Sequence, residues 1–113
     1  MDKQTKKHLK DILIAIDEIE YFFETRPKLY AEFTNNLLLR RAIERNIEII
    51  GEAMNRILKS ESNITITNAR KIVDTRNYVI HGYDTLTADI LWSIVVNHLP
   101  VLKTEVNELL EKA

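Results

Sequence analysis

Apolar residues recur at spacings of three and four through most of this chain, which is the period of one face of an α-helix. From Thr5 to about Thr25 they form a stripe that consists of Leu9, Ile12, Leu13, Ile16, Ile19 and Phe23. We expect the segment Arg26-Pro27-Lys28 to break this helix, because the proline disfavours the helical conformation of the residue before it. A second, longer helix is predicted from about Tyr30 to Lys59, with a stripe made of Leu39, Ile43, Asn46, Ile47, Ile50, Met54 and Ile57.

The second half of the chain predicts a loop and two more helices. Residues 60 to 67 have no helical period and are rich in β-branched and cap-forming residues, which favours a loop. A short third helix is predicted from about Asn68 to His81, and it should stop near Gly82 because glycine suits the left-handed turn that ends many helices. Thr85 or Thr87 can cap a fourth helix, whose stripe is Leu91, Val95, His98, Leu102, Val106 and Leu109. We expect a kink or a break at Pro100, because its ring removes a backbone donor inside this helix.

Four amphipathic helices in 113 residues predict an all-α, up-and-down four-helix bundle that forms one domain over residues 1–113. The third helix is short, so one end or one flank of the bundle should be open. Leu37, Leu38, Ile49 and Trp92 lie off the main stripes and add apolar surface. A homodimer would use this surface, and broader burial inside the monomer is the alternative.

Composition narrows the class of protein. The chain has no cysteine, which excludes a disulfide framework, a thiol nucleophile and a cysteine zinc site. No apolar run approaches the roughly 20 residues that span a membrane, and no secretory segment opens the chain, so we expect a cytoplasmic protein. The net charge of −1 indicates no overall attraction to nucleic acid. Residues 40–76 carry eight basic and five acidic side chains, which is a mild local excess that solvated helix faces also explain.

The segment R-N-Y-V-I-H-G-Y, residues 76 to 83, carries the candidate chemistry. Asn77 and His81 are four residues apart on a helix, so the amide can hold the imidazole in one orientation and tautomer. Arg76 is five residues from His81, about 140° around an ideal helix, so the two groups do not automatically converge. A distortion near Gly82, or a second copy related by a two-fold axis, could bring them together. This geometry favours a site built by a dimer.

An arginine and a histidine suit the cleavage of RNA. Histidine exchanges a proton near neutral pH, and arginine is a permanent cation that matches phosphate oxygens. The 2′-hydroxyl of RNA is itself the nucleophile, so the site needs neither a metal nor a nucleophile from the protein. The ordinary alternative is a charged surface arginine and a histidine that the dipole favours at a helix C-terminus.

Other polar residues are weaker candidates. Glu44, Glu48 and Glu52 form a ladder at helical spacing, but a di-metal site in a bundle also needs Glu-x-x-His pairs, so we expect no metal and no cofactor. Gly51 and Ala53 allow close approach of another helix, and Glu52 between them is a candidate interior carboxylate. Of the other histidines, His8 is expected at the solvated surface and His98 at the edge of the core or at an interface.

The stretch from Arg76 to Tyr83 resembles the Arg-x4-His-x-Tyr motif of the HepT-like toxins, which belong to the HEPN superfamily of helical ribonucleases. The segment from Arg41 to Ala53, which ends in Gly-Glu-Ala, is similar to a helix of that family. Trp92 and the stretch from Leu99 to Leu102 resemble its final helix. The similarity extends in order over roughly residues 40 to 110.

This resemblance implies a metal-independent endoribonuclease that acts as the toxin of a two-component system, beside an antitoxin with a minimal nucleotidyltransferase fold. Arg76 would then stabilise the charge on the attacked phosphate, His81 would be the general acid or base, and Asn77 would orient substrate or histidine. Tyr83 would accept AMP from ATP through the antitoxin, which would obstruct RNA. The alternative is a non-catalytic helical partner module that docks a nucleotidyltransferase and uses Arg76 and His81 to bind a nucleotide.

Overall fold

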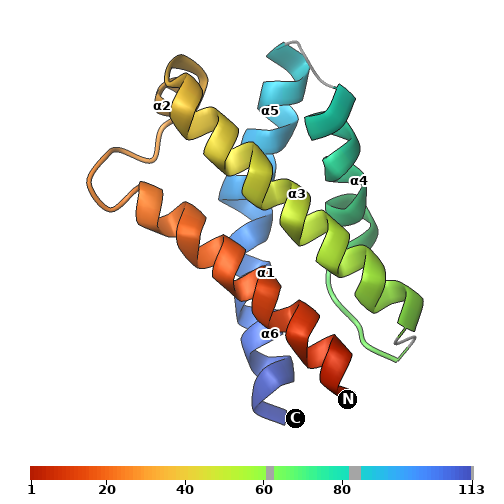
Figure 1. Cartoon of the computed structure of the whole chain (residues 1–113). Helices are drawn as coiled ribbons and strands as arrows, with labels where there is room; N and C mark the ends of the chain where they lie inside the picture. Colours follow the sequence, from red (N-terminus) through yellow and green to blue (C-terminus); the bar gives the residue numbers. More distant parts are fainter. Residues whose placement is uncertain (61–62, 82–84, 113) are drawn as a thin grey trace.

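The computed structural model describes residues 1–60, 63–81 and 85–112, except for the side chains of Asn77, Tyr78, Ile80, His81, Thr85 and Leu86. The described residues contain helices and no strand, so the predicted all-α class is confirmed (Figure 1). The elements in chain order are α1 (Lys3–Phe22), α2 (Tyr30–Asn35), α3 (Leu37–Ser60), α4 (Ala69–His81), α5 (Thr85–Ser93), the π-helical turn η1 (Ile94–His98) and α6 (Leu99–Lys112).

Four rods run up and down in the molecule, namely α1, α3, α4 and the continuous rod of α5, η1 and α6 (Figure 1). Helix α3 lies between α1 and α4 and packs on both of them. Helix α1 also packs on α6, and α4 packs on α5, so the rods enclose one core. The predicted four-helix bundle with a short third helix is therefore confirmed, and α4 is the element that carries Arg76, Asn77 and His81.

The prediction of a single helix from Tyr30 to Lys59 is wrong, because two helices, α2 and α3, occupy this segment. They are separated at Asn36, whose backbone is extended with φ −112° and ψ 100°. The Asn36 side chain accepts a hydrogen bond from the Leu39 N–H at 3.0 Å, which satisfies one of the free donors at the start of α3. The break has no proline or glycine to mark it in the sequence.

An aromatic cluster holds the short helix α2 against α5. Phe33 of α2 is fully buried and stacks on Trp92 with ring centroids 5.4 Å apart. Phe23 and Tyr30 pack edge-on against the same Trp92 ring. The Tyr30 hydroxyl donates a hydrogen bond to the Asp89 carboxylate of α5, and this bond raises the pKa of Tyr30. Trp92 is thus used inside the monomer, as the broader-burial alternative predicts.

The last rod changes its hydrogen-bond pattern just before Pro100. In η1 the Leu99 N–H bonds to the Ile94 carbonyl, five residues back, instead of the usual four. The proline ring has no N–H and would collide with the carbonyl of the preceding turn, so a π-helical turn ahead of it relieves the clash. The kink or break expected at Pro100 takes the form of this π-helical turn at residues 94–98, ahead of the proline, and the rod continues through it into α6. Thr87 lies inside α5 and therefore does not cap it.

The predicted stripes form most of the core. On α3 every stripe residue is buried, and on α1 and the last rod most are buried, whereas Leu13, Phe23, His98 and Leu109 are half-buried. One expectation is wrong: His8 is 6% exposed, because it lies on the side of α1 that faces the core. Leu37 and Leu38 are 64% and 82% exposed, so this apolar surface is not covered within the monomer.

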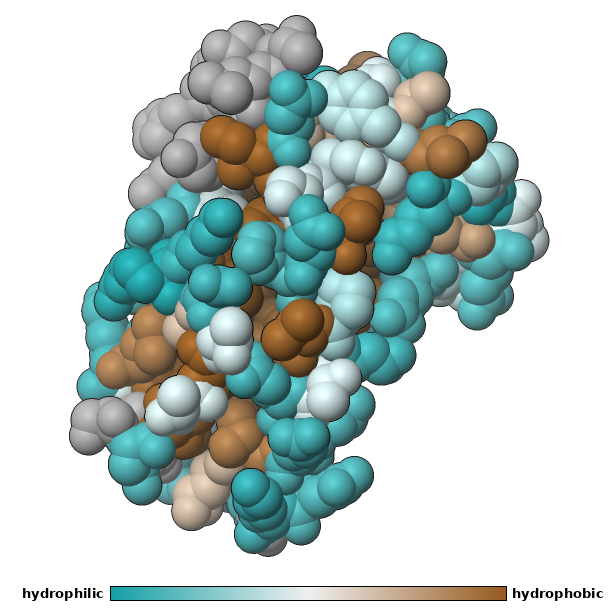
Figure 2. Space-filling model, turned by 180° about the vertical axis from the view of Figure 1, so that it is seen from behind, coloured by the Kyte–Doolittle hydropathy of each residue, from teal (hydrophilic) through white to brown (hydrophobic). Residues whose placement is uncertain are grey.

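The surface opposite to that in Figure 1 carries apolar residues in separate patches among polar ones (Figure 2). The large apolar side chains that are exposed over the described chain include Ile14, Tyr21, Val96 and Val101. Among the described residues, none of the helices contains an apolar stretch of the length that crosses a membrane.

Candidate functional site

The start of helix α4 is fixed by the loop before it. Asn68 adopts a left-handed conformation with φ 59°, which asparagine tolerates better than most residues. Its carbonyl accepts a hydrogen bond from the Ile72 N–H at 3.0 Å and so begins the helix. The neighbouring Thr67 donates from its backbone N–H and its hydroxyl to the Glu105 carboxylate of α6, at 3.1 and 2.8 Å. These contacts hold the motif-bearing helix in place on the bundle.

Helix α3 packs closely against α4 at Gly51. A β-carbon placed on this glycine would lie 3.3 Å from the Arg76 Cβ and 3.3 Å from the Ile72 carbonyl oxygen. The expectation that Gly51 allows close helix approach is confirmed. The expectation for Glu52 is wrong, because this carboxylate is exposed on the outer side of α3. The Cβ of Arg76 therefore packs directly against α3.

Arg76 is half-buried, with its Cβ against Gly51. Within the part of the chain that the structure describes, no ion pair joins its guanidinium to a carboxylate. Other arginines nearby are paired: Arg41 is 2.7 Å from Glu44 and Arg45 is 3.7 Å from Glu48. Among the described residues, Arg76 is thus a half-buried arginine on the side of α4 that packs on α3, and it carries no ion pair.

Asn77 and His81 lie one helical turn apart on α4, and His81 is the last residue of this helix. Their side chains lie outside the described atoms, so the contact between the amide and the imidazole stays a prediction. Gly82 and Tyr83 lie outside the described residues. Because α4 is regular through His81, Arg76 and His81 are about 140° apart around its axis. The described part of one chain therefore does not bring them to the same side of the helix.

The three glutamates of the predicted ladder have different surroundings. Glu44 is 6% exposed and accepts hydrogen bonds from Arg40 at 3.1 Å and Arg41 at 2.7 Å. Glu48 is half-buried and Glu52 is exposed. The Arg40 guanidinium also lies 5.7 Å above the Phe33 ring, so this ion pair belongs to the packing of α2 on α3. Over the described residues, no group of three metal-ligating side chains comes together.

His98, the last residue of η1, lies beside the start of α4, and His81 is at the other end of that helix. It is half-buried, and its Nδ1 lies 3.3 Å from the Asn68 amide nitrogen. Burial, and then the nearby charge of Lys71, lower the pKa of the His98 imidazole. Helix α4, with His81 at its far end, is about 20 Å long at 1.5 Å per residue. The placement of His98 at the edge of the core is confirmed.

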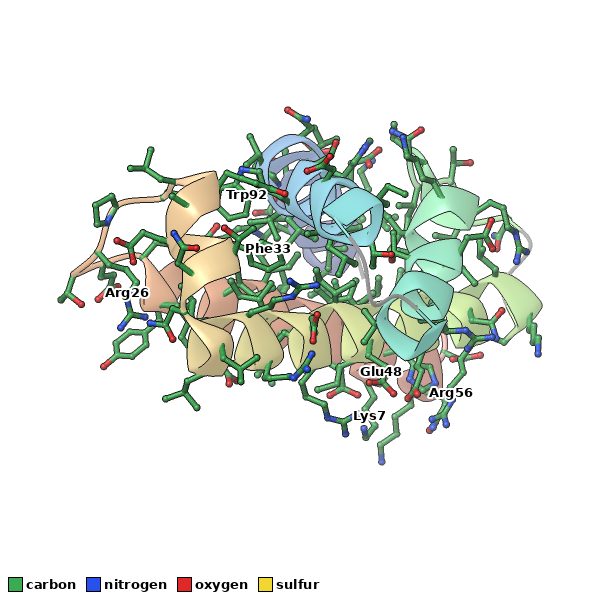
Figure 3. The ribbon with its side chains drawn as sticks, turned by 90° about the horizontal axis from the view of Figure 1, so that it is seen from above. Lys7, Arg26, Phe33, Glu48, Arg56 and Trp92 are labelled. Atoms are coloured by element: carbon green, nitrogen blue, oxygen red, sulfur yellow. The ribbon has the colours of Figure 1, made fainter. Side chains whose placement is uncertain are left out.

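A lysine-rich surface on α1 was not anticipated from the sequence. A shallow hollow of about 480 Å³ is lined by Lys3, Gln4, Lys6, Lys7, Lys10, Asp11 and Ile14. Lys7 pairs with Asp11 at 2.9 Å, which leaves an excess of positive charge. Lys7, Glu48 and Arg56 point to the same side of the molecule (Figure 3). The repetition of lysine at helical spacing was the available signal, because it places these cations on one face of α1.

The comparisons with known proteins concern nearly the whole chain. The family model described as "Ribonuclease HepT-like" matches residues 12–109. A candidate RNase of Methanocaldococcus jannaschii is 35% identical over 106 residues, which cover 92% of this chain and 94% of the relative. A probable ribonuclease HepT of Thermococcus cleftensis is 31% identical over 110 residues, which cover 96% and 98%. No solved structure matches the chain.

Proposed function

Because this chain belongs to the HepT-like ribonuclease family, we propose that it is a metal-independent endoribonuclease and the toxin of a two-component toxin–antitoxin system. The observation that carries the proposal is the surroundings of Arg76. It is a half-buried arginine without an ion pair to a described carboxylate, five residues before the histidine that ends α4. A permanent planar cation in this setting is suited to bind a phosphate.

The proposed reaction uses the RNA itself as nucleophile. The 2′-hydroxyl loses its proton and its oxygen attacks the adjacent phosphorus, while the bond from phosphorus to the 5′-oxygen breaks and that oxygen takes up a proton. The products are a 2′,3′-cyclic phosphate and a 5′-hydroxyl. Arg76 stabilises the added negative charge on the phosphate oxygens. His81 performs one of the two proton transfers, and Asn77 orients the imidazole or the substrate.

A homodimer supplies the arrangement that one helix does not. The 140° between Arg76 and His81 separates them within one copy of α4. A two-fold axis beside α4 places Arg76 of one subunit near His81 of the partner subunit and forms two equivalent sites. The lysine-rich face of α1 adds positive charge for a polyanion, which the net charge of the chain does not provide.

The decisive test is cleavage without metal. Purified unmodified protein is incubated with cellular RNA in excess EDTA, and the fragments and their ends are identified by mass spectrometry. We expect cleavage with 2′,3′-cyclic phosphate ends, because no step of the reaction needs a metal ion. Intact RNA after incubation with a verified unmodified dimer would contradict the proposal and favour the non-catalytic partner module.

Inhibition is proposed to occur at Tyr83, through a cognate antitoxin with a minimal nucleotidyltransferase fold. The phenol oxygen attacks the α-phosphorus of ATP, pyrophosphate leaves, and the AMP that remains adds bulk and negative charge two residues beyond His81. We expect antitoxin and ATP to increase the mass of the toxin by adenylyl groups and to stop RNA cleavage. Tyr83→Phe should keep cleavage and gain no mass. Modification of Tyr83→Phe at the wild-type rate would assign the acceptor elsewhere.

A further inference from the structure

We propose that Gly51 of α3 is a positioning residue for Arg76. Because it has no side chain, it sets the separation of α3 and α4 at which the guanidinium meets the scissile phosphate. This inference rests on the proposed ribonuclease function and adds to it a residue outside the Arg-x4-His-x-Tyr motif. Gly51 acts through Arg76 and does not itself touch the RNA.

The atoms around Gly51 would make tight contacts with even a methyl group. A β-carbon on Gly51 would meet the Arg76 Cβ at 3.3 Å, the Ile72 carbonyl oxygen at 3.3 Å and the Val73 carbonyl oxygen at 3.6 Å. All three atoms belong to the backbone of α4 or to the first atom of a side chain. A change of rotamer therefore cannot relieve the contact, and α4 itself has to move by a few tenths of an ångström.

The local conformation of α3 does not call for a glycine. Gly51 lies inside a helix of 24 residues, and no described glycine has a positive φ. Alanine stabilises a helix interior relative to glycine, so local preference alone would favour alanine at this position. The requirement for glycine therefore comes from α4, and Arg76 is the residue of α4 whose side chain begins at the contact.

A small displacement of α4 has a large effect on the proposed chemistry. The guanidinium of Arg76 has to donate two parallel hydrogen bonds to phosphate oxygens, which fixes its orientation. The methyl group of an alanine at position 51 would push on the Cβ of this same arginine. Misplacement of a catalytic group by about 1 Å can cost about a hundredfold in rate, so a few tenths of an ångström are expected to cost about tenfold. RNA binding, which depends on many phosphate contacts, should change little.

The test is a double-mutant cycle on RNA cleavage with Gly51→Ala, Arg76→Ala and the double variant. We expect Gly51→Ala to lower kcat about tenfold with KM nearly unchanged. Arg76→Ala keeps the Cβ and so keeps the steric contact, but it has no guanidinium to misplace. In that background Gly51→Ala is expected to cause no further loss, as a residue that acts through another one should. Thermal unfolding of each variant gives the effect on stability separately.

Two outcomes would overturn the inference while the proposed function stands. One is a loss from Gly51→Ala that is equal with and without the Arg76 guanidinium, because the glycine would then act on the fold or on another group. The other is a crystal structure of Gly51→Ala in which Arg76 keeps its place relative to α3. Failure of the wild-type protein to cleave RNA in the same assay would overturn the proposed function and this inference together.

Discussion

Replacement of His81 by alanine is expected to slow RNA cleavage about a thousandfold and to leave the bundle folded, because general acid–base catalysis by one side chain contributes about a hundredfold to ten-thousandfold. His81 is the last residue of α4. A helix end tolerates alanine, so the loss of rate should not come with a loss of structure. Single-turnover cleavage of a labelled RNA measures the rate, and circular dichroism with thermal unfolding measures the fold. Cleavage at the wild-type rate would remove His81 from the mechanism.

Mixing of inactive subunits tests whether two chains build the site. In a mixed dimer of His81→Ala and Arg76→Ala, one site keeps both groups if each site takes its arginine and its histidine from different subunits. Random exchange makes half of the dimers mixed, so about a quarter of the wild-type activity should return. Each variant alone should cleave only at its slow residual rate. A mixture that remains inactive after verified exchange would place Arg76 and His81 of one site on the same chain.

Truncation of Phe33 to alanine is expected to destabilise the protein by about 3 to 5 kcal/mol, the usual cost for a buried phenylalanine. Phe33 is fully buried and stacks on Trp92 at 5.4 Å. Helix α2 has six residues, too few to be stable without this packing. Urea unfolding, followed by far-ultraviolet circular dichroism, gives the free energy of unfolding of wild type and variant.

The matched control for Phe33 lies close by in the chain. Leu38 is 82% exposed, so Leu38→Ala removes apolar atoms without opening a cavity. Its effect on the free energy of unfolding should be below about 0.5 kcal/mol, as for most surface substitutions. Equal effects of the two truncations would show that the aromatic cluster is not what holds α2 to the bundle.

The sequence was enough to place the candidate site residues on one helix, but it did not predict their surroundings in space. Helical spacing and the family resemblance together placed Arg76, Asn77 and His81 on α4 and proposed their roles. Among the described residues, no carboxylate forms an ion pair with Arg76, and this depends on which side chains of α3 face α4. The spacing of residues within α4 contains no information about that orientation. The same is true of the contact at Gly51, where the sequence indicated only that a close approach was possible.

The sequence by itself determined most of the helical segments, most of the buried faces and the presence of an irregularity near Pro100, because these properties follow from the period of apolar side chains and from proline within a few residues. The tertiary structure decided the break at Asn36, the burial of His8 and the contact of Gly51 with Arg76. Each of these depends on residues that are far apart in the chain and meet only when the helices pack.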